Sequence, residues 1–145
     1  MDTIDQQVIS CLLQDGRATY AEIGDVVGLS APAVKRRVDR LLESGAVKGF
    51  TAVVDPTALG WTTEAYVEVY CTGTVAPQSL RRSLESVPEV VGACTVSGAA
   101  DALLHLLAAD IGHLERAIER VRDNAHVDHT ESVIVLSRLI DRPRS

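Results

Sequence analysis

Aromatic residues are scarce in this chain of 145 residues, which contains one Phe, one Trp and three Tyr. Its core must therefore be mainly aliphatic, and the 46% of residues that are hydrophobic are enough to build one domain or two small ones. Cysteine is scarce too, since Cys11, Cys71 and Cys94 are far apart, odd in number and set in apolar stretches. This usage predicts buried free thiols in a reducing compartment and argues against a disulfide-based fold.

Long hydrophobic runs are also missing. Charged residues interrupt the apolar stretches well before they reach the length that a membrane span requires. The first residues, Met1–Asp5, are acidic, whereas a secretion leader is basic and then apolar. We therefore expect a cytoplasmic protein without a membrane partner.

Basic residues are too few for a protein that coats nucleic acid without specificity, because the formal net charge is −6. Their distribution is more informative, since Lys35, Arg36, Arg37 and Arg40 lie within six consecutive positions. One explanation is that any solvated helix face carries charge. The other is contact with phosphates, which is favoured because the positive charge is concentrated on one helix opposite an apolar stripe.

The stretch Gly28–Leu41 predicts a tight turn followed by a helix with two different faces. Ser30 is a suitable N-cap for this helix. At about 100° per residue, one face presents Ala33, Arg36 and Arg40. The opposite face is apolar and consists of Val34, Val38 and Leu41. Such a helix fits the DNA major groove as the second helix of a helix-turn-helix.

Two shorter helices are predicted ahead of this one. The first has a capping box between Thr3 and Gln6 and ends where Gly16 supplies a left-handed turn. The second begins with a capping box between Thr19 and Glu22. Three short capped helices with a glycine turn before the third predict a helix-turn-helix domain.

Two extended pieces, Ala46–Val47 and Phe50–Val54, are expected after the helices and predict a small wing. The segment Asp55–Gly60 contains Asp-Pro and Leu-Gly pairs, which break regular structure. We therefore place a winged helix-turn-helix domain with its linker at residues 1–60.

Residues 61–145 show the element order β-α-β-β-α-β. The expected strands are Glu64–Cys71, Val90–Ser97, Ala102–Ala109 and Val127–Leu139, and the expected helices are Pro77–Val87 and Ile111–Asn124. This order predicts a ferredoxin-like domain, in which both helices cover one face of a four-stranded antiparallel sheet. The last strand is long enough to contain a bulge. The fold class is therefore α+β.

The strand sequences also predict how the sheet is covered. In the third strand Leu103 and Leu107 alternate with Leu104 and Leu106, so we expect both faces to be apolar. The helices cover one face, and a second copy of the sheet is expected on the other, in a two-fold homodimer. A dimer also suits DNA, because two recognition helices can reach two half-sites.

Short motifs in a fixed order run through the whole chain. They are Ile4-Asp5, Leu12–Arg17, Tyr20–Ile23, Val27–Ser30, Val34, Arg37-Val38, Arg40-Leu41, Gly45, Val47, Gly49–Ala52, Asp55-Pro56, Leu59-Gly60 and Val96–Asp101. Together they resemble the Lrp/AsnC family of prokaryotic transcription factors, the feast/famine regulators. The resemblance implies a winged helix-turn-helix joined to a ferredoxin-like (RAM/ACT-like) ligand-sensing domain. It also implies binding to double-stranded promoter DNA, homodimers that assemble to octamers, and small effectors, usually amino acids, bound between dimers.

The third helix offers two kinds of DNA contact. Ala33, Arg36 and Arg40 are expected to face the groove, because arginine can form bidentate bonds to guanine and a small residue lets the helix approach closely. Phosphate contacts, which fix register, are expected from Ser30, Lys35, Arg37 and Lys48. For Arg37 the alternative is a structural salt bridge to a neighbouring helix.

The candidate effector site is the turn Ser97-Gly98-Ala99-Ala100-Asp101. Backbone N–H groups beside Gly98 can approach a carboxylate and Asp101 can pair with an ammonium, and an amino acid offers both groups. The family resemblance adds Thr130 and Ser132 as hydroxyl contacts. Ala99 and Ala100 stand where the family often has polar or aromatic residues, which leaves the effector open. The alternative is an ordinary hairpin turn in which Asp101 bonds its own backbone.

Other functions have less support. The sequence shows no nucleophile with a partnered base, no phosphate loop and no paired carboxylates, so neither an enzyme nor a cofactor is expected. His105, His126 and His129 do not complete a tetrahedral set, so no metal site is expected. A ligand-independent protein that organises DNA would share this fold and remains an alternative. The basic helix face argues against a sensor with a vestigial DNA-binding half.

Overall fold

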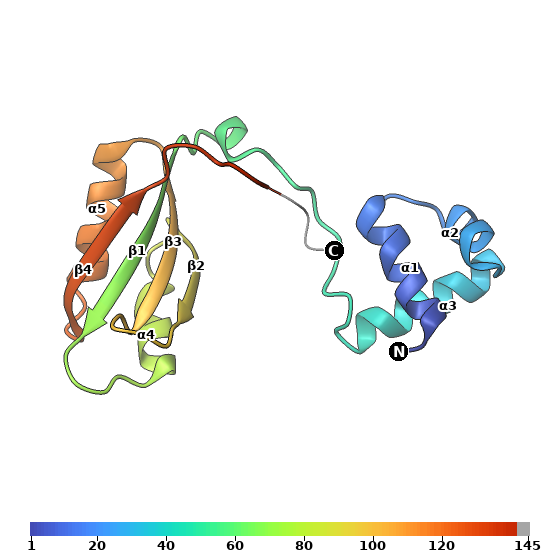
Figure 1. The fold of residues 1–145 in the computed structure, drawn as a ribbon, viewed down its shortest axis with the longest axis horizontal. Helices are drawn as coiled ribbons and strands as arrows, with labels where there is room; N and C mark the ends of the chain where they lie inside the picture. The colour runs from blue at the N-terminus through green and yellow to red at the C-terminus, as the bar shows by residue number, and fades with distance from the viewer. Residues whose placement is uncertain (142–145) are drawn as a thin grey trace. The chain divides into compact units, whose positions relative to one another are not determined.

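The computed structural model describes residues 1–141, which form two compact units built on residues 1–53 and 54–139 (Figure 1). The first unit is helical, and the second is a sheet with helices. Among the described residues, no helix is both long enough and apolar enough to cross a membrane.

The first unit consists of α1 (Thr3–Gln14), α2 (Tyr20–Val27) and α3 (Ala31–Glu43). Each helix places apolar residues three or four positions apart, so that they meet in one core. The buried core residues are Val8, Ile23, Val34, Val38 and Leu41. These helices confirm the predicted helix-turn-helix, and the apolar stripe predicted for α3 lies in the core of this unit.

The ends of these helices agree with prediction in two cases and differ in two. The Thr19 capping box and the Ser30 N-cap are both present. In α1, however, the N-cap is Asp2 and its capping-box partner is Asp5, one residue earlier than predicted. The predicted left-handed Gly16 is also wrong, because the Asp15 side chain accepts a hydrogen bond from the Arg17 amide at 2.8 Å and forms the turn itself.

The predicted wing is not formed within residues 1–141 of the single chain, because no strand lies between α3 and β1. The Val47 amide donates to the Leu41 carbonyl at 3.0 Å, which folds Ala46–Val47 back onto the end of α3. Phe50–Val54 therefore has no hairpin partner, and Val53 is fully exposed. A short 3₁₀ helix, η1 (Pro56–Leu59), follows.

The second unit confirms the ferredoxin-like prediction. Its elements are β1 (Thr63–Cys71), α4 (Pro77–Leu84), β2 (Val90–Thr95), β3 (Ala102–Ala108), α5 (Ile111–Arg122) and β4 (Val127–Ile134). All strand pairs are antiparallel, in the order β2-β3-β1-β4. Both helices pack on one face of the sheet, where they share a core with the inward side chains of the strands (Figure 1).

Several elements end earlier than predicted, and α4 and β4 are shortened most. Helix α4 ends at Leu84 rather than Val87, because a residue before proline disfavours the helical conformation and Pro88 follows. Strand β4 ends at Ile134 rather than Leu139. Its pairing with β1 stops at Ala65–Ile134, with one further bond from the Val135 amide to the Glu64 carbonyl, and β1 itself begins only two residues before Ala65. The predicted bulge is present in β4, where the pairing with β1 shifts by one residue at Asp128.

The two faces of the sheet differ, and the prediction that both are apolar is wrong for the outer face. The inward residues Ala65, Val67 and Val69 of β1 are completely buried. The outer face instead carries two stacked pairs of rings: Tyr66 with His105, at 4.8 Å between centroids, and Tyr70 with His129, at 4.3 Å. Other outward residues include Glu64, Glu68, Leu103, Leu107, Glu131 and Val133. This face is therefore mixed in polarity.

Candidate nucleic-acid interface and effector site

The outer surface of α3 contains a hollow of about 460 Å³. Its lining residues are Leu29, Ala33, Arg36, Arg37, Asp39, Arg40 and Glu43. The structure thus brings together the three residues predicted to face the DNA groove. It also shows that acidic side chains, which the sequence analysis did not consider, stand beside them.

Arg37 is held by α1. Its Nη1 atom donates to Asp2 Oδ2 at 2.8 Å and to Asp5 Oδ1 at 2.7 Å, and its side chain is 19% exposed. The hydrogen bond from Arg37 lowers the pKa of both carboxyl groups, and the bond to each from a backbone amide lowers it further. The alternative of a structural salt bridge is therefore what this geometry supports for Arg37, in place of the predicted phosphate contact.

Lys35, Arg36 and Arg40 differ in their partners. Lys35 Nζ lies 2.6 Å from Asp39 Oδ2, and this hydrogen bond raises the pKa of the ammonium group. By contrast, neither Arg36 nor Arg40 forms an ion pair with any residue in the described part of the chain, and both are exposed. These two arginines are therefore the cations of α3 that are available to a polyanion.

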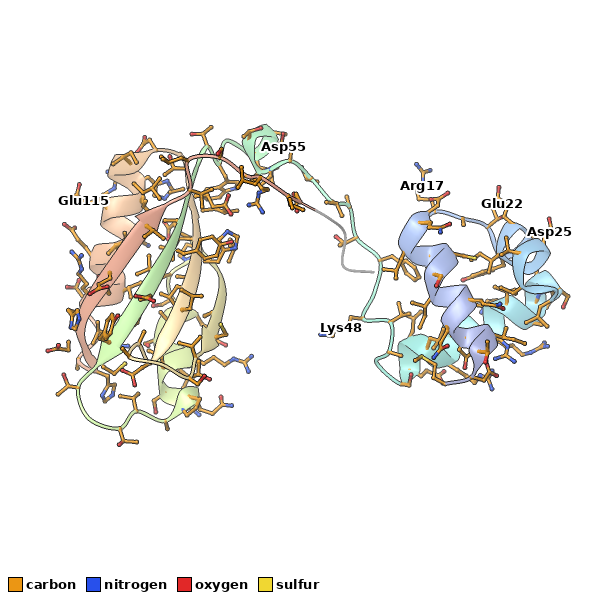
Figure 2. All side chains as sticks on the ribbon, in the orientation of Figure 1. Arg17, Glu22, Asp25, Lys48, Asp55 and Glu115 are labelled. Atoms are coloured by element: carbon orange, nitrogen blue, oxygen red, sulfur yellow. The ribbon has the colours of Figure 1, made fainter. Side chains whose placement is uncertain are left out.

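The remaining predicted DNA contacts lie at the margins of α3. The Ser30 hydroxyl accepts a hydrogen bond from the Ala33 amide at 3.4 Å, so its first role is to cap the helix. Lys48 is exposed on the segment that follows α3 (Figure 2). No strand among the described residues forms a wing around it, and its prediction as a phosphate contact stays untested.

Gly24, on α2, is a position that the sequence analysis missed. A Cβ atom at this residue would lie 2.3 Å from the Leu29 carbonyl oxygen, far inside contact distance. The Gly24 carbonyl also accepts hydrogen bonds from Gly28 and Leu29, at 2.8 and 3.0 Å. The glycine therefore allows the turn to pack tightly on α2 ahead of α3. A glycine inside an amphipathic helix was the available signal.

The predicted effector turn joins β2 to β3, and Asp101 ties it to β1. Asp101 Oδ2 accepts a hydrogen bond from the Cys71 amide at 2.7 Å, and the Asp101 amide donates to the Val69 carbonyl at 2.9 Å. Ala100 is buried, whereas Ser97, Gly98 and Ala99 are exposed. One carboxylate oxygen of Asp101 is thus already used, for the backbone of β1 rather than for that of its own turn.

Thr130 and Ser132 do not join this turn within one chain. Val69 pairs with Ala102 on one side and with Thr130 on the other, so β1 separates Thr130 from the turn by two strand spacings, about 10 Å. Thr130 also accepts a hydrogen bond from Arg122 at 2.8 Å. A single chain therefore presents two separate halves of the predicted site.

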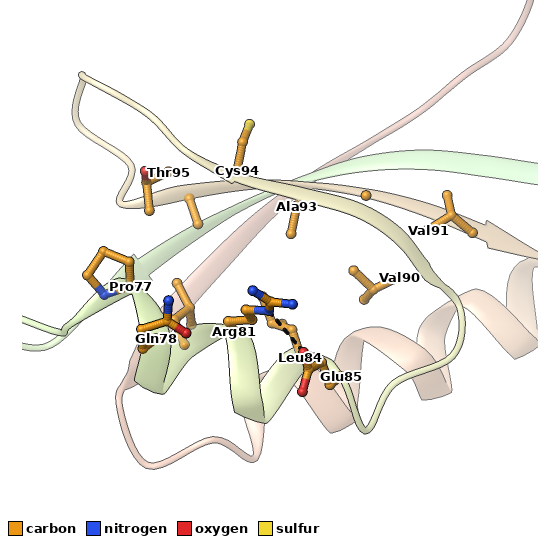
Figure 3. Close-up of a pocket in the computed structure, with 13 residues that line it drawn as sticks. Pro77, Gln78, Arg81, Leu84, Glu85, Val90, Val91, Ala93, Cys94 and Thr95 are labelled. Atoms are coloured by element: carbon orange, nitrogen blue, oxygen red, sulfur yellow. Dashed lines mark hydrogen bonds and ion pairs between the residues drawn. The ribbon is translucent and has the colours of Figure 1, made fainter. Parts of the chain in front are cut away.

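A second hollow, of about 490 Å³, lies between α4 and the edge strand β2 (Figure 3). Leu84, Val90 and Ala93 contribute apolar walls, and an ion pair between Arg81 and Glu85 at 3.0 Å crosses one side. Cys94 points away from the α4 side (Figure 3). None of the predicted effector residues lines this hollow. The sequence did not reveal it, because it depends on how α4 packs against β2.

A buried acid, Glu89, lies outside both candidate sites. Its side chain is 6% exposed, and its Oε1 atom accepts from His113 Nε2 at 2.8 Å and from Arg120 Nη2 at 2.5 Å. The Ala109 amide donates to His113 Nδ1 at 3.1 Å, which leaves Nε2 as the donor to Glu89. Across residues 1–141, no cluster of His, Cys, Asp and Glu could hold a metal ion.

Comparison with known proteins finds a matching domain family for each of the two units. Residues 1–42 match the AsnC-type helix-turn-helix domain, and residues 64–145 match the Lrp/AsnC ligand binding domain. Among curated relatives, the HTH-type transcriptional regulator Rv2324 of Mycobacterium tuberculosis is 58% identical over 142 residues, covering 98% of this chain and 96% of the relative. The regulator LrpA of the same organism is 34% identical, covering 94% and 91%.

A solved structure of similar fold is the feast or famine regulatory protein Rv3291c of M. tuberculosis in complex with L-methionine. It is 33% identical with a TM-score of 0.91, covering 99% of this chain and 97% of that chain.

Proposed function

Because the chain belongs to the Lrp/AsnC family of transcriptional regulators, we propose that it binds promoter DNA through the outer face of α3 and that an amino acid bound by its second unit modulates this binding. The observation that carries the DNA part is the division of cations on α3. Lys35 and Arg37 are engaged by carboxylates, whereas Arg36 and Arg40 form no ion pair with any residue among positions 1–141.

This division suggests separate roles. Arg36 and Arg40 flank Ala33 on the exposed side of α3 and can form bidentate bonds to guanine in the major groove. Ser30, Lys35 and Lys48 are proposed as contacts to phosphates, which fix the register of the protein on the duplex.

The working unit is proposed to be a homodimer formed through the outer face of the sheet. Leu103, Leu107 and Val133 lie on that face with the two Tyr–His stacks, and Val133 is 65% exposed in the single chain. A two-fold dimer would present two copies of α3 to two half-sites. Association of such dimers up to an octamer is part of the proposal.

The effector is proposed to lie between dimers. In a single chain, Ser97–Asp101 and the pair Thr130 and Ser132 stay apart, and contacts from a second copy can complete the site. The exposed amides beside Gly98 would receive the carboxylate, and the unused oxygen of Asp101 would receive the ammonium. The relative Rv3291c, solved with L-methionine, makes that amino acid the first to test.

The proposal is tested by gel-shift titration of the full-length protein on the DNA upstream of its own gene, with and without a panel of amino acids. Arg36→Ala and Arg40→Ala should each weaken specific binding at least tenfold. Arg17→Ala is the matched control, because this exposed arginine lies outside α3 and should leave binding unchanged (Figure 2). Wild-type affinity in both α3 variants would overturn the assigned roles.

The same titration separates the regulator from the alternative of an architectural DNA protein. A shift of the binding curve by one amino acid supports effector control. Tight binding to many sequences with no response to any amino acid supports the architectural function instead. The observation that favours this alternative is Ala100, which is buried within the turn and offers no polar side chain to an effector.

A further inference from the structure

The hollow on α3 is lined by both apolar and charged side chains. We call its apolar part, Leu29 and Ala33, the floor and its charged part the walls. Leu29 and Ala33 supply the carbon surface, and Arg36 and Arg40 stand beside it. We propose that Leu29 and Ala33 together contact the 5-methyl group of a thymine in the operator, next to a guanine bound by Arg36 or Arg40. This inference rests on the proposed DNA-binding function and adds the base feature that the apolar floor recognises.

The floor is held in place by the backbone. The Leu29 amide donates to the Gly24 carbonyl at 3.0 Å, and the Leu29 side chain is half-buried against the core of the first unit. Ala33 lies in the first turn of α3, which the Ser30 cap fixes. Covering such a fixed apolar surface with an apolar group is favourable, because it removes both surfaces from water.

The walls are partly fixed as well. Arg37 is held by Asp2 and Asp5, and Asp39 is held by Lys35. These ion pairs restrain two of the charged side chains that line the hollow. The free arginines supply the charge complementarity that draws a DNA duplex to this surface.

Thymine is the base that fits this floor. In the major groove each base edge offers hydrogen-bonding atoms, and thymine also offers a methyl group. A polar edge placed on Leu29 and Ala33 would lose its water without gaining a partner.

The helix spacing predicts where this thymine lies. Ala33 and Arg36 are three residues apart, a rise of about 4.5 Å along the helix axis. Because base pairs are about 3.4 Å apart, the thymine should lie within about two base pairs of the guanine.

The test replaces each thymine of the upstream DNA by uracil, one at a time, and measures binding of the full-length protein by gel shift at one salt concentration. Uracil pairs as thymine does and lacks only the methyl group. We expect one or two positions in each half-site where uracil weakens binding about fourfold, the effect of losing one buried methyl. Near each of them, 7-deazaguanine in place of guanine should also weaken binding.

Ala33→Ser assigns the effect to the protein surface, because serine keeps a similar size and adds a hydroxyl group. The variant should bind thymine and uracil DNA equally, and thermal melting checks that it is folded. If the wild type binds the operator but no uracil matters, this inference is overturned and the proposed function stands. If the Ala33→Ser variant still binds thymine DNA more tightly than uracil DNA, then Leu29 and Ala33 do not recognise the methyl group. Failure of the wild type to prefer any DNA would reject the proposed function itself.

Discussion

Arg37 of α3 and Asp5 of α1 form a short ion pair, in which Nη1 of the arginine lies 2.7 Å from Oδ1 of the aspartate. The same aspartate completes the capping box of α1. The N-terminus of α1 is thereby attached to the helix that carries the candidate DNA surface. Arg37 is therefore a positioning residue for α3.

Replacing Arg37 by glutamine should lower the melting temperature and should weaken binding to all DNA sequences about equally. Because Arg37 lowers the pKa of Asp2 and Asp5, their contribution to stability is complete above the unfolded value, about 3.9, and is lost as pH falls through the lowered folded values. Circular dichroism melts across the acid range should show a flatter pH dependence in the variant. Arg17→Gln is the control, and identical acid profiles for Arg37→Gln and wild type would contradict the assignment.

Gly24→Ala should destabilise the first unit by about 1–3 kcal/mol, since the added methyl must displace the Leu29 backbone. Urea unfolding followed by circular dichroism measures the loss. Gly16→Ala is the control: its Cβ would meet the nearest neighbour at an ordinary 3.8 Å. Equal midpoints for the two variants would show that the turn can move away at little cost.

Glu89→Gln should cost about 1–3 kcal/mol, because the amide N–H groups would be buried without acceptors. Burial raises the pKa of Glu89, but the hydrogen bonds from Arg120 and His113 outweigh this and lower it overall. The wild type should therefore lose this contribution as pH falls below the unfolded value of about 4.3, and the variant should not.

The chain's one tryptophan reports this change, since the rings of Trp61 and His113 are 5.9 Å apart. Urea titrations followed by Trp61 fluorescence at several pH values give the stability of each variant. Glu115→Gln, exposed on α5, is the control (Figure 2). A variant with the stability and acid response of wild type would show that the buried cluster contributes nothing.

The three cysteines should react with iodoacetamide at different rates. Cys94 is exposed and should react first. Burial raises the pKa of the Cys71 thiol, and the nearby Asp101 charge raises it further, so less of the reactive thiolate is present. Mass spectrometry of labelled peptides at mildly alkaline pH gives the order. Reaction of Cys71 ahead of Cys94 would mean that the end of β1 opens in solution.

Local signals in the sequence were enough for most of the fold. Ser30 and Thr19 cap helices because the hydroxyl and the free N–H groups are neighbours in the chain. The alternation of apolar and polar residues along β1 is also a local signal, and Val67 and Val69 from its apolar side are buried in the core. The boundaries that depend on distant partners were missed: the pairing of β4 with β1 stops at Ala65–Ile134, two residues from the start of β1.

The candidate sites were predictable only in part. The amphipathic pattern of α3 predicted that Arg36 and Arg40 lie on the exposed face. The pattern does not show which basic side chains of the helix form ion pairs with carboxylates. That Arg37 contacts Asp5, 32 positions earlier, follows from how α1 crosses α3. Likewise, the distance between Asp101 and Thr130 depends on strand order, which the sequence predicted as a topology without side-chain positions.

The bond between Asp101 and the Cys71 amide joins the candidate effector turn to the end of β1. Its last residue is held by the candidate effector turn, and its first residue, Thr63, follows the segment that leads back to the helix-turn-helix. The nine residues of this strand span about 30 Å. A ligand that binds the second carboxylate oxygen of Asp101 would therefore lie one hydrogen-bonded residue away from a central strand of the sheet.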